Sequence, residues 1–229
     1  MSGCMGIVSM FVDRWDLVPV FWAISIVADG LDGMMARALK VSNPLGKELD
    51  SLADMVTFGV MPGVILYHLM AKMTGGGVMP EKDFVLLALP GFLITLFSAI
   101  RLAKFNIDER QTDSFIGLAT PACTGYVVGL LAIHIYNFGG LGDFILNPFL
   151  LYGSAVLFSY LLISEIPMFG FKLKALKWKG NEFQFIYLGL AIIMLPIMRT
   201  AALSLGVIIY LVMAFIHNLT VRKSLFYKS

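Results

Sequence analysis

Apolar residues fill most of this chain in long blocks, and short polar or glycine-rich links separate the blocks. A helix needs about 20 mostly apolar residues to cross a hydrocarbon core about 30 Å thick. Seven blocks reach or approach that length, and they predict helices near 17–39, 48–71, 84–104, 116–137, 146–167, 182–198 and 200–219. The pattern predicts an all-α integral membrane protein and excludes an ordinary soluble domain.

An eighth apolar block, from Gly3 to Val12, has only about half the length of a spanning helix. It lacks a basic start and a small-residue cleavage site, so we do not interpret it as a signal peptide. We expect it to be the outer half of a helix whose beginning is missing. With this segment the chain predicts a polytopic bundle of about eight transmembrane helices, forming a single domain over residues 1–229.

Composition narrows the classes of partner. Charged residues make up 14% of the chain, against about 25% in soluble domains. The formal net charge is +2 and no run of like charge exceeds two residues, so we expect no nucleic-acid partner. Cys4 and Cys123 lie in apolar stretches without metal-ligand spacing, which argues against a disulfide framework or a zinc site.

The basic residues are distributed unequally between the two sides of the predicted bundle. Four face one side, namely Arg14, Lys72, Lys82 and Arg199. The other 13 face the opposite side, in three loops and the tail: Arg37, Lys40, Lys47, Arg101, Lys104, Arg110, Lys172, Lys174, Lys177, Lys179, Arg222, Lys223 and Lys228. Since cytoplasmic loops of membrane proteins are enriched in Lys and Arg, the side with 13 is predicted to be cytoplasmic.

Four carboxylates lie in two consecutive apolar helices, where a charge at mid-membrane costs about 2.5–3.5 kcal/mol. Asp29 and Asp32 are three residues apart, and Asp50 and Asp54 are four apart, so each pair shares one helical face. The two helices meet at a short cytoplasmic turn, which lets the faces converge. A bound divalent cation would neutralise such a cluster, and all-oxygen ligands favour Mg²⁺, Mn²⁺ or Ca²⁺ over zinc.

Small residues and one arginine accompany the acids. Gly30, Gly33 and Gly46 remove side chains beside them, which would let a nucleotide approach the backbone. Arg37 offers a planar fork suited to phosphate. Acids, cation, glycines and arginine together indicate a diphosphate-binding site. The alternative is helix packing through small residues, with the acids paired to nearby basic side chains; four acids in phase favour the metal site.

The motif Asp29-x-x-Asp32-Gly33-x-x-Ala36-Arg37, eight residues, Gly46-x-x-x-Asp50-x-x-x-Asp54 resembles, at every fixed position, the signature of the CDP-alcohol phosphotransferase family. This resemblance over residues 29–54 implies the family's membrane fold and a catalytic domain. The implied enzyme moves a phosphoalcohol group from a CDP-activated donor to an acceptor hydroxyl and releases CMP. The family further implies two divalent cations, Mg²⁺ or Mn²⁺, and a homodimer.

The resemblance also implies roles for individual residues. Asp29, Asp32 and Asp50 would hold metal, and Asp54 would help to hold it while acting as the general base. The CDP moiety would be contacted by Asp32, Gly33, Arg37 and Gly46.

Flanking segments resemble the phosphatidylserine synthase branch of that family, from about residue 20 to residue 185. They are Ser51–Val60, Arg101–Asn106, Ser114–Ala122, and Ile166–Met168 followed by Lys172 and Lys174. Two departures are Ala119, where that branch commonly has proline, and the first helix, which is longer in the branch. The resemblance implies CDP-diacylglycerol as donor and L-serine as acceptor, at the cytoplasmic face of a bacterial inner membrane.

Serine carries a carboxylate at neutral pH, so its site requires a cation. Arg101, at the cytoplasmic end of its helix, can bind a carboxylate with both arms of its fork, and Asn106 can bind the amine or the hydroxyl. Arg101 could instead merely mark the cytoplasmic face.

Two other functions remain open. The same chemistry could use glycerol 3-phosphate, inositol or inositol phosphate as acceptor. A cation transporter is less favoured, because transport would favour acids spread through the membrane depth.

Overall fold

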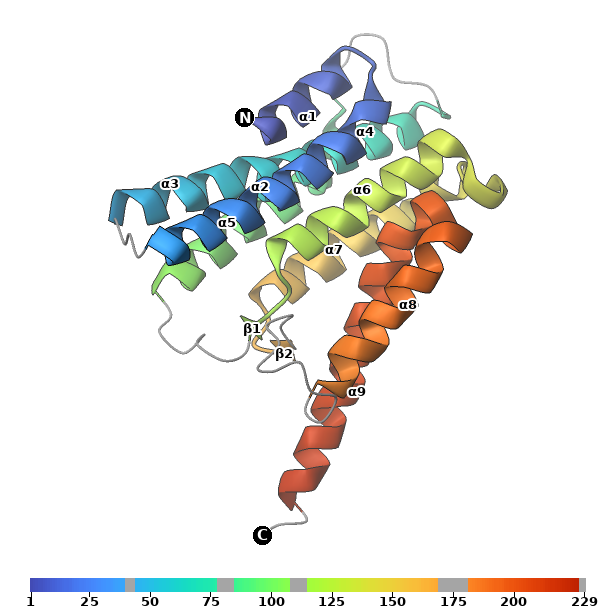
Figure 1. Ribbon diagram of the computed structural model, residues 1–229. Helices are drawn as coiled ribbons and strands as arrows, with labels where there is room; N and C mark the ends of the chain where they lie inside the picture. The colour runs from blue at the N-terminus through green and yellow to red at the C-terminus, as the bar shows by residue number, and fades with distance from the viewer. Residues whose placement is uncertain (40–43, 78–84, 108–114, 169–180, 227–229) are drawn as a thin grey trace.

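The computed structural model describes residues 1–39, 44–77, 85–107, 115–168 and 181–226, except for the side chains at 36, 37, 44, 115 and 220–226. Most of this part of the chain is helical, and the helices form one bundle (Figure 1). The main helices are α1 (Ser2–Phe11), α2 (Val18–Leu39), α3 (Pro44–Asp54), α4 (Met61–Thr74), α5 (Leu93–Ile107), α6 (Thr120–Tyr136), α7 (Pro148–Ile163), α8 (Glu182–Met198) and α9 (Ala202–Phe226).

Short segments connect or extend these helices. A π-helical segment, η2 (Met55–Val60), joins α3 to α4. Tighter 3₁₀ turns precede or follow other helices, at η1 (Trp15–Leu17), η3 (Leu86–Phe92), η4 (Phe138–Gly140), η5 (Phe144–Leu146) and η6 (Arg199–Ala201).

The prediction of an all-α membrane protein is confirmed, and each predicted apolar block contains a helix. Four helical stretches of the described chain are long and apolar enough to cross a membrane: Trp15–Met35, Leu45–Thr74, Leu86–Ile107 and Glu182–Leu219, the last containing both α8 and α9. Helices α1, α6 and α7 are apolar but shorter. The basic loops that contain Lys40, Lys82, Arg110 and Lys172–Lys179 lie outside the described residues.

Two predicted helix ends are wrong. The helix expected near 116–137 begins only at Thr120, and the one expected near 146–167 ends at Ile163. The segment before α6 and the segment after α7 instead form two short antiparallel strands, β1 (Phe115–Ile116) and β2 (Pro167–Met168). Apolar character alone could not reveal this change, because a paired strand satisfies the backbone as a helix does.

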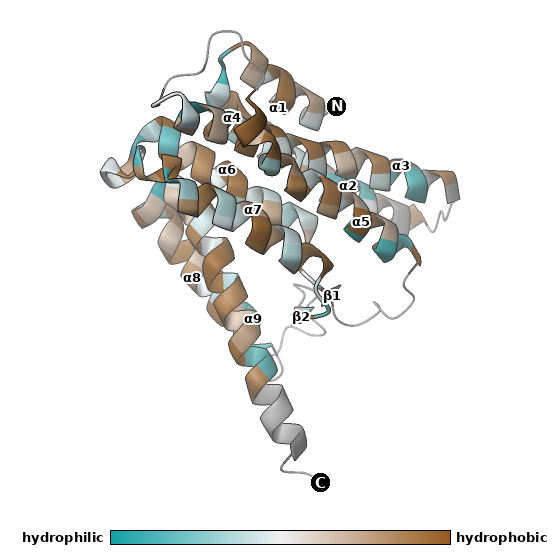
Figure 2. Ribbon diagram, turned by 180° about the vertical axis from the view of Figure 1, so that it is seen from behind, coloured by the Kyte–Doolittle hydropathy of each residue, from teal (hydrophilic) through white to brown (hydrophobic). Residues whose placement is uncertain are grey.

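The core of the bundle is built around α4 and α6. Leu66 and Leu69 of α4 and Val127 and Leu131 of α6 are fully buried, and α6 is buried around most of its circumference. The outer helices carry many exposed large apolar residues, such as Val27 of α2, and Figure 2 shows hydrophobic colouring along their outward faces. A bilayer provides the apolar surroundings that such faces need.

The helix widens directly after Asp54 into η2. Such π-helical segments shift the backbone hydrogen bonds by one residue, and side-chain hydroxyls can bind the displaced carbonyls in an apolar layer. The Thr95 hydroxyl of α5 donates to the Gly59 carbonyl at 2.8 Å. The Thr124 hydroxyl of α6 lies 2.9 Å from the Phe58 carbonyl. Two neighbouring helices therefore hold this segment in place.

Two glycines, which have no side chain, allow neighbouring helices to approach η2 closely. A Cβ atom at Gly3 of α1 would lie 2.8 Å from the Thr57 Cα, and one at Gly59 would lie 3.2 Å from the Ser98 Cβ of α5. Small residues at such contacts let helix backbones come together in membranes. The backbone that follows Asp54 is therefore packed on two sides.

The α8–α9 pair runs at an angle to the other helices in both views (Figures 1 and 2). It contacts α6 where the Ser204 hydroxyl donates to the Tyr126 carbonyl at 2.8 Å. Farther along α9, the Asn218 side-chain amide donates to the Pro167 carbonyl of β2 at 2.7 Å.

We expect the two threonine bonds to η2 to stabilise the fold measurably. Thr95→Val and Thr124→Val keep the shape but leave a carbonyl without its partner, so each should lower the free energy of unfolding by about 0.5–2 kcal/mol. Unfolding of the purified protein in detergent measures this. Thr74→Val is the control, because its hydroxyl bonds only within its own helix end; an equal loss in the control would contradict the assignment.

Candidate active site

Helices α2 and α3 bring three of the acidic side chains together. Asp29 and Asp32 come from α2 and Asp50 comes from α3, and one carboxylate oxygen from each lies within 4.8 Å of the others. Asp29 is half-buried, whereas Asp32 and Asp50 are exposed. The structure therefore brings together three of the four acids that were predicted to converge.

This donor set fits a divalent cation of the hard class. Two oxygens that share one Mg²⁺ lie at most about 4.2 Å apart, and two that share one Ca²⁺ lie at most about 5 Å apart, from twice the metal–oxygen distance. The limit of 4.8 Å among the three carboxylates is close to these spans. All three donors are carboxylate oxygens, which suits Mg²⁺, Mn²⁺ or Ca²⁺. The three acids could therefore hold a metal ion.

Asp54 lies deeper than the three clustered acids. It is the last residue of α3, is half-buried, and directly precedes η2. Its carboxylate interacts electrostatically with the three clustered acids and with Arg101. Asp54 is thus close enough to feel the charges of both the cluster and the buried cation.

Arg101 is unusually buried for an arginine, with 8% of its surface exposed. It lies on α5, one turn after Ser98. Its Nε and the Ser98 hydroxyl are buried and have no hydrogen-bond partner among the described residues. Buried polar groups normally have partners, so this pair of unsatisfied donors beside Asp54 marks a place suited to a polar ligand.

A hydrogen-bonded junction links the start of α3 to the end of α5. The Asn106 amide donates to the Ser51 hydroxyl at 2.9 Å, and the Lys47 ammonium donates to the Asn106 carbonyl at 3.0 Å. Ser51 lies between Asp50 and Asp54 in sequence. The junction therefore fixes the acidic helix α3 relative to the helix that carries Arg101.

The residues predicted to contact CDP are only partly described. Gly33 is half-buried and Gly46 is exposed. A Cβ atom at Gly30 would meet nothing within 4 Å, so the space beside the acids on this helix is open. The backbone of Arg37 belongs to α2, but its side chain lies outside the described residues.

Sequence reasoning missed three features of this site. It did not predict the π-helical segment after Asp54, the unsatisfied Ser98 hydroxyl, or the partnership of Asn106 with Ser51. Ser98 offered a weak signal, because it lies one turn before Arg101 on the same helix. The other two features depend on contacts between helices, which no local pattern displays.

Comparison with known proteins agrees with this geometry. The model of the CDP-alcohol phosphatidyltransferase family matches residues 2–161, which include all four acids and Arg101. The chain belongs to this family of membrane enzymes.

Individual relatives are more specific. The chain is 31% identical over 210 residues, 88% of its length and 81% of the relative's, to CDP-diacylglycerol--serine O-phosphatidyltransferase of Helicobacter pylori strain J99. It is 32% identical over 171 residues, 74% of its length, to the protein of the same name from Bacillus subtilis strain 168, of which 84% is covered. A third similar protein with this name is from Methanocaldococcus jannaschii, at 29% identity over 83% of this chain and 79% of the relative.

The Ser51–Asn106 bond leads us to expect that the two side chains act as one unit. Ser51→Ala and Asn106→Ala should each lower kcat by about 3- to 10-fold, and the double variant should fall little further, since bonded partners are not additive. The KM for the acceptor should change little. Steady-state CMP release measures both constants, with exposed Lys104→Ala as the control on the same helix end. A rise in acceptor KM for Asn106→Ala alone would instead favour the predicted direct contact.

Proposed function

We propose that this protein transfers the phosphatidyl group of CDP-diacylglycerol to the hydroxyl of L-serine, giving phosphatidylserine and CMP. The observation that carries the proposal is the cluster of three acids, with Asp54 in electrostatic interaction both with that cluster and with buried Arg101. The three relatives described above are named for this reaction. Family membership supports transfer from a CDP-linked donor.

In this proposal Asp54 is the general base. It takes the proton of the serine hydroxyl, and the serine oxygen forms a bond to the phosphorus of the phosphatidyl group. The bond from that phosphorus to the oxygen shared with CMP breaks, and its electron pair leaves with CMP. A base must reach the hydroxyl proton, and the half-buried place of Asp54 beside Arg101 supports that role.

We propose that Asp29, Asp32 and Asp50, with help from Asp54, hold two divalent cations, Mg²⁺ or Mn²⁺, which bind the diphosphate. When bound, such ions neutralise the charge of the diphosphate and of the departing CMP. Gly33 and Gly46 leave room for the CDP moiety, with Asp32 and Arg37 beside it. The open space beside Gly30 supports this assignment.

Arg101 is proposed to bind the serine carboxylate. An anionic ligand would give the buried guanidinium the hydrogen-bond partner that its Nε lacks among the described residues. Glycerol 3-phosphate and inositol phosphate would instead bring a phosphate dianion, which calls for a second buried cation. Of the basic side chains that the structure describes at this end, Lys104 is exposed and Lys47 already donates to Asn106, which favours serine.

The placement of the acids also argues against cation transport. They gather near one end of the bundle instead of being spread through its depth. Lys47, Arg101 and Lys104 lie toward the same end, whereas Arg14, Lys72 and Arg199 lie at the other. We propose that the acidic end faces the cytoplasm, following the positive-inside rule, and that the membrane is a bacterial inner membrane.

We further propose that residues 1–229 act as one catalytic domain and that the enzyme is a homodimer. The family resemblance supports both statements. Cross-linking in native membranes would test the second, since a monomer would give no specific cross-linked pair.

The acceptor assignment predicts a specific kinetic defect. Arg101→Ala should raise the KM for serine by about 10- to 1,000-fold, because a charged hydrogen-bonded contact is lost, and leave the KM for CDP-diacylglycerol nearly unchanged. Arg101→Lys should fall between. The assay is CMP release with serine, ethanolamine, glycerol 3-phosphate, inositol phosphate and inositol in turn. The wild type should prefer serine; equal damage to both KM values in Arg101→Ala would contradict the acceptor role.

The roles of the acids can be separated from one another. Asp50→Asn should insert and fold normally but release no CMP at any Mg²⁺ or Mn²⁺ concentration. Asp54→Asn should still bind CDP-diacylglycerol with metal, yet transfer should fall by about 100-fold or more because the base is lost. Donor binding measured by calorimetry beside CMP release distinguishes the two. If Asp54→Asn keeps its rate and loses only metal affinity, Asp54 is not the base.

A further inference from the structure

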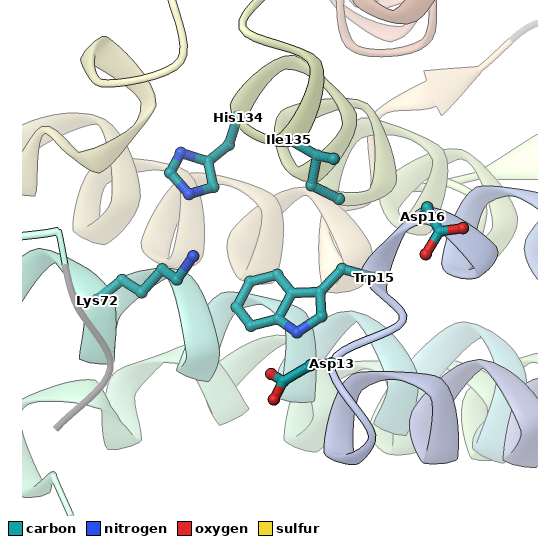
Figure 3. Close-up of a pocket in the computed structure, with 6 residues that line it drawn as sticks. All are labelled: Asp13, Trp15, Asp16, Lys72, His134 and Ile135. Carbon is teal, nitrogen blue, oxygen red and sulfur yellow. The ribbon is translucent and has the colours of Figure 1, made fainter. Parts of the chain in front are cut away.

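A second polar site lies at the end of the bundle opposite the acids. It is a cavity of about 490 Å³ lined by Asp13, Trp15, Asp16, Lys72, His134 and Ile135. These residues come from the link between α1 and α2, the end of α4 and the end of α6. Figure 3 shows Lys72 and His134 on one side of the cavity, with the Trp15 ring beside them and the two aspartates beyond it.

The helices themselves separate this cavity from the candidate active site. Lys72 lies 18 residues after Asp54 along one continuous helical stretch. At about 1.5 Å per residue this is about 27 Å, close to the thickness of a hydrocarbon core. The cavity therefore lies near the opposite membrane surface and has no part in the proposed reaction.

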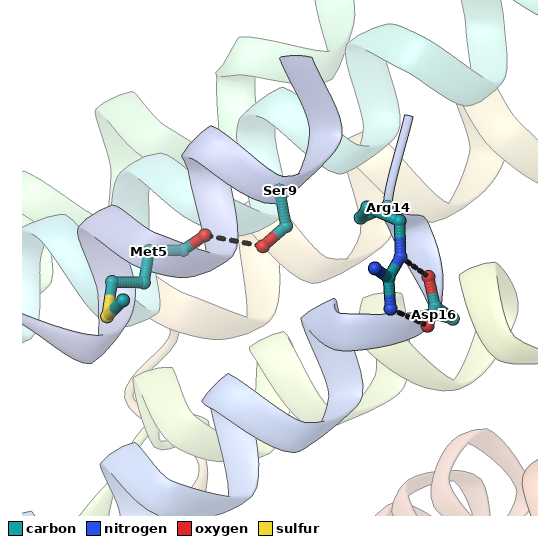
Figure 4. A network of polar contacts seen from close by, with 4 residues as sticks. All are labelled: Met5, Ser9, Arg14 and Asp16. Atoms are coloured by element: carbon teal, nitrogen blue, oxygen red, sulfur yellow. Dashed lines mark hydrogen bonds and ion pairs between the residues drawn. The ribbon is translucent and has the colours of Figure 1, made fainter. Parts of the chain in front are cut away.

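The charged groups of the cavity are not equally available. Both Asp16 carboxylate oxygens accept bonds from the Arg14 guanidinium, each at 3.0 Å, so this acid is already neutralised (Figure 4). Asp13 and Lys72, in contrast, have no ion-pair partner within 4.0 Å among the described residues. The Lys72 ammonium lies 4.4 Å from the centre of the Trp15 ring. One acid and one cation remain available to a ligand.

His134 is held by its neighbour in a way that leaves one ring nitrogen for the cavity. Its Nδ1 lies 2.9 Å from the Gly142 carbonyl, which can only accept, so Nδ1 carries the hydrogen. Nε2 is the remaining nitrogen. Asp13 is held in a left-handed backbone conformation, with φ of 56°, which few residues other than Asn, Asp and Gly adopt readily. The His134 ring is therefore held by its neighbour, and the backbone at Asp13 has a conformation that suits an aspartate.

We propose that this cavity binds a zwitterion made of a phosphate diester and a primary ammonium, as in an aminophospholipid head group of the leaflet opposite the active site. Lys72 binds the phosphate, and Asp13 accepts hydrogen bonds from the ammonium; with its hydrogen on Nδ1, His134 offers Nε2 as a second acceptor for the ammonium. A quaternary ammonium has no hydrogen to donate and is recognised by several aromatic faces. The lining offers only the Trp15 indole, whose face Lys72 already covers.

The test uses the full chain in lipid nanodiscs or micelles, and it measures dissociation constants for short-chain phosphatidylethanolamine, phosphatidylcholine and phosphatidylglycerol by native mass spectrometry. The wild type should prefer phosphatidylethanolamine by about 10-fold or more over the other two, because each lacks one of the two contacts. The dissociation constant of soluble glycerophosphoethanolamine is measured as well, because this compound has the same head group without the acyl chains. If it binds more weakly than phosphatidylethanolamine, the ligand is a membrane lipid. If the two bind equally, the same site binds a free metabolite.

Two variants identify the groups responsible. Lys72→Met keeps the apolar stem, and Asp13→Asn keeps a residue that tolerates the left-handed backbone. Each should weaken phosphatidylethanolamine binding by about 10-fold, and only Lys72→Met should weaken phosphatidylglycerol. Lys104→Met, at the other end of the bundle, is the matched control, and CMP release should be unchanged in all three. Equal affinities for the three lipids, or unchanged affinities in both variants, would overturn the proposal.

Discussion

Mutual repulsion among carboxylates is the constraint on which the arrangement at the acidic end of the bundle depends. Asp29, Asp32 and Asp50 lie within 4.8 Å of one another, and Asp54 interacts with all three. Like charges this close, near an apolar layer, cost energy unless a cation accompanies them. The surrounding structure opposes the repulsion by fixing α3 firmly, through Ser51, Asn106 and Lys47 on one side and the packed backbone of η2 on the other.

The widened helical turn after Asp54 connects the acids with the bundle core. Residues before it are largely exposed, and residues after it, such as Met61 and Ile65, are fully buried. The threonines that bind its carbonyls come from α5 and α6, and α5 also carries Arg101. One set of contacts therefore positions Asp54 and Arg101 with respect to each other. Such fixed positions are needed where neighbouring side chains act on one ligand.

Much of this architecture could be predicted from the sequence, because membrane helices and in-phase acids leave periodic local patterns. The helices that carry Asp29, Asp50 and Arg101 lie where the apolar blocks predicted them. Features that join distant residues could not be predicted in the same way. Thr124 and Phe58 are 66 positions apart, and Asn106 and Ser51 are 55 apart. Neither pair belongs to a repeating pattern, so only the packed structure reveals that Asn106 is already engaged.

The two short strands, β1 before α6 and β2 after α7, have a consequence for how this fold tolerates sequence change. The chain leaves its helical form there, yet its backbone remains paired: the Gly117 amide donates to the Ile166 carbonyl and the Leu118 amide to the Leu161 carbonyl, each at 2.9 Å. Main-chain bonds survive most side-chain replacements. Gly117 is the exception, since its φ is +75° and a Cβ would lie 2.8 Å from the Ser164 carbonyl oxygen. Where the two strands meet, the backbone itself therefore excludes a side chain at Gly117.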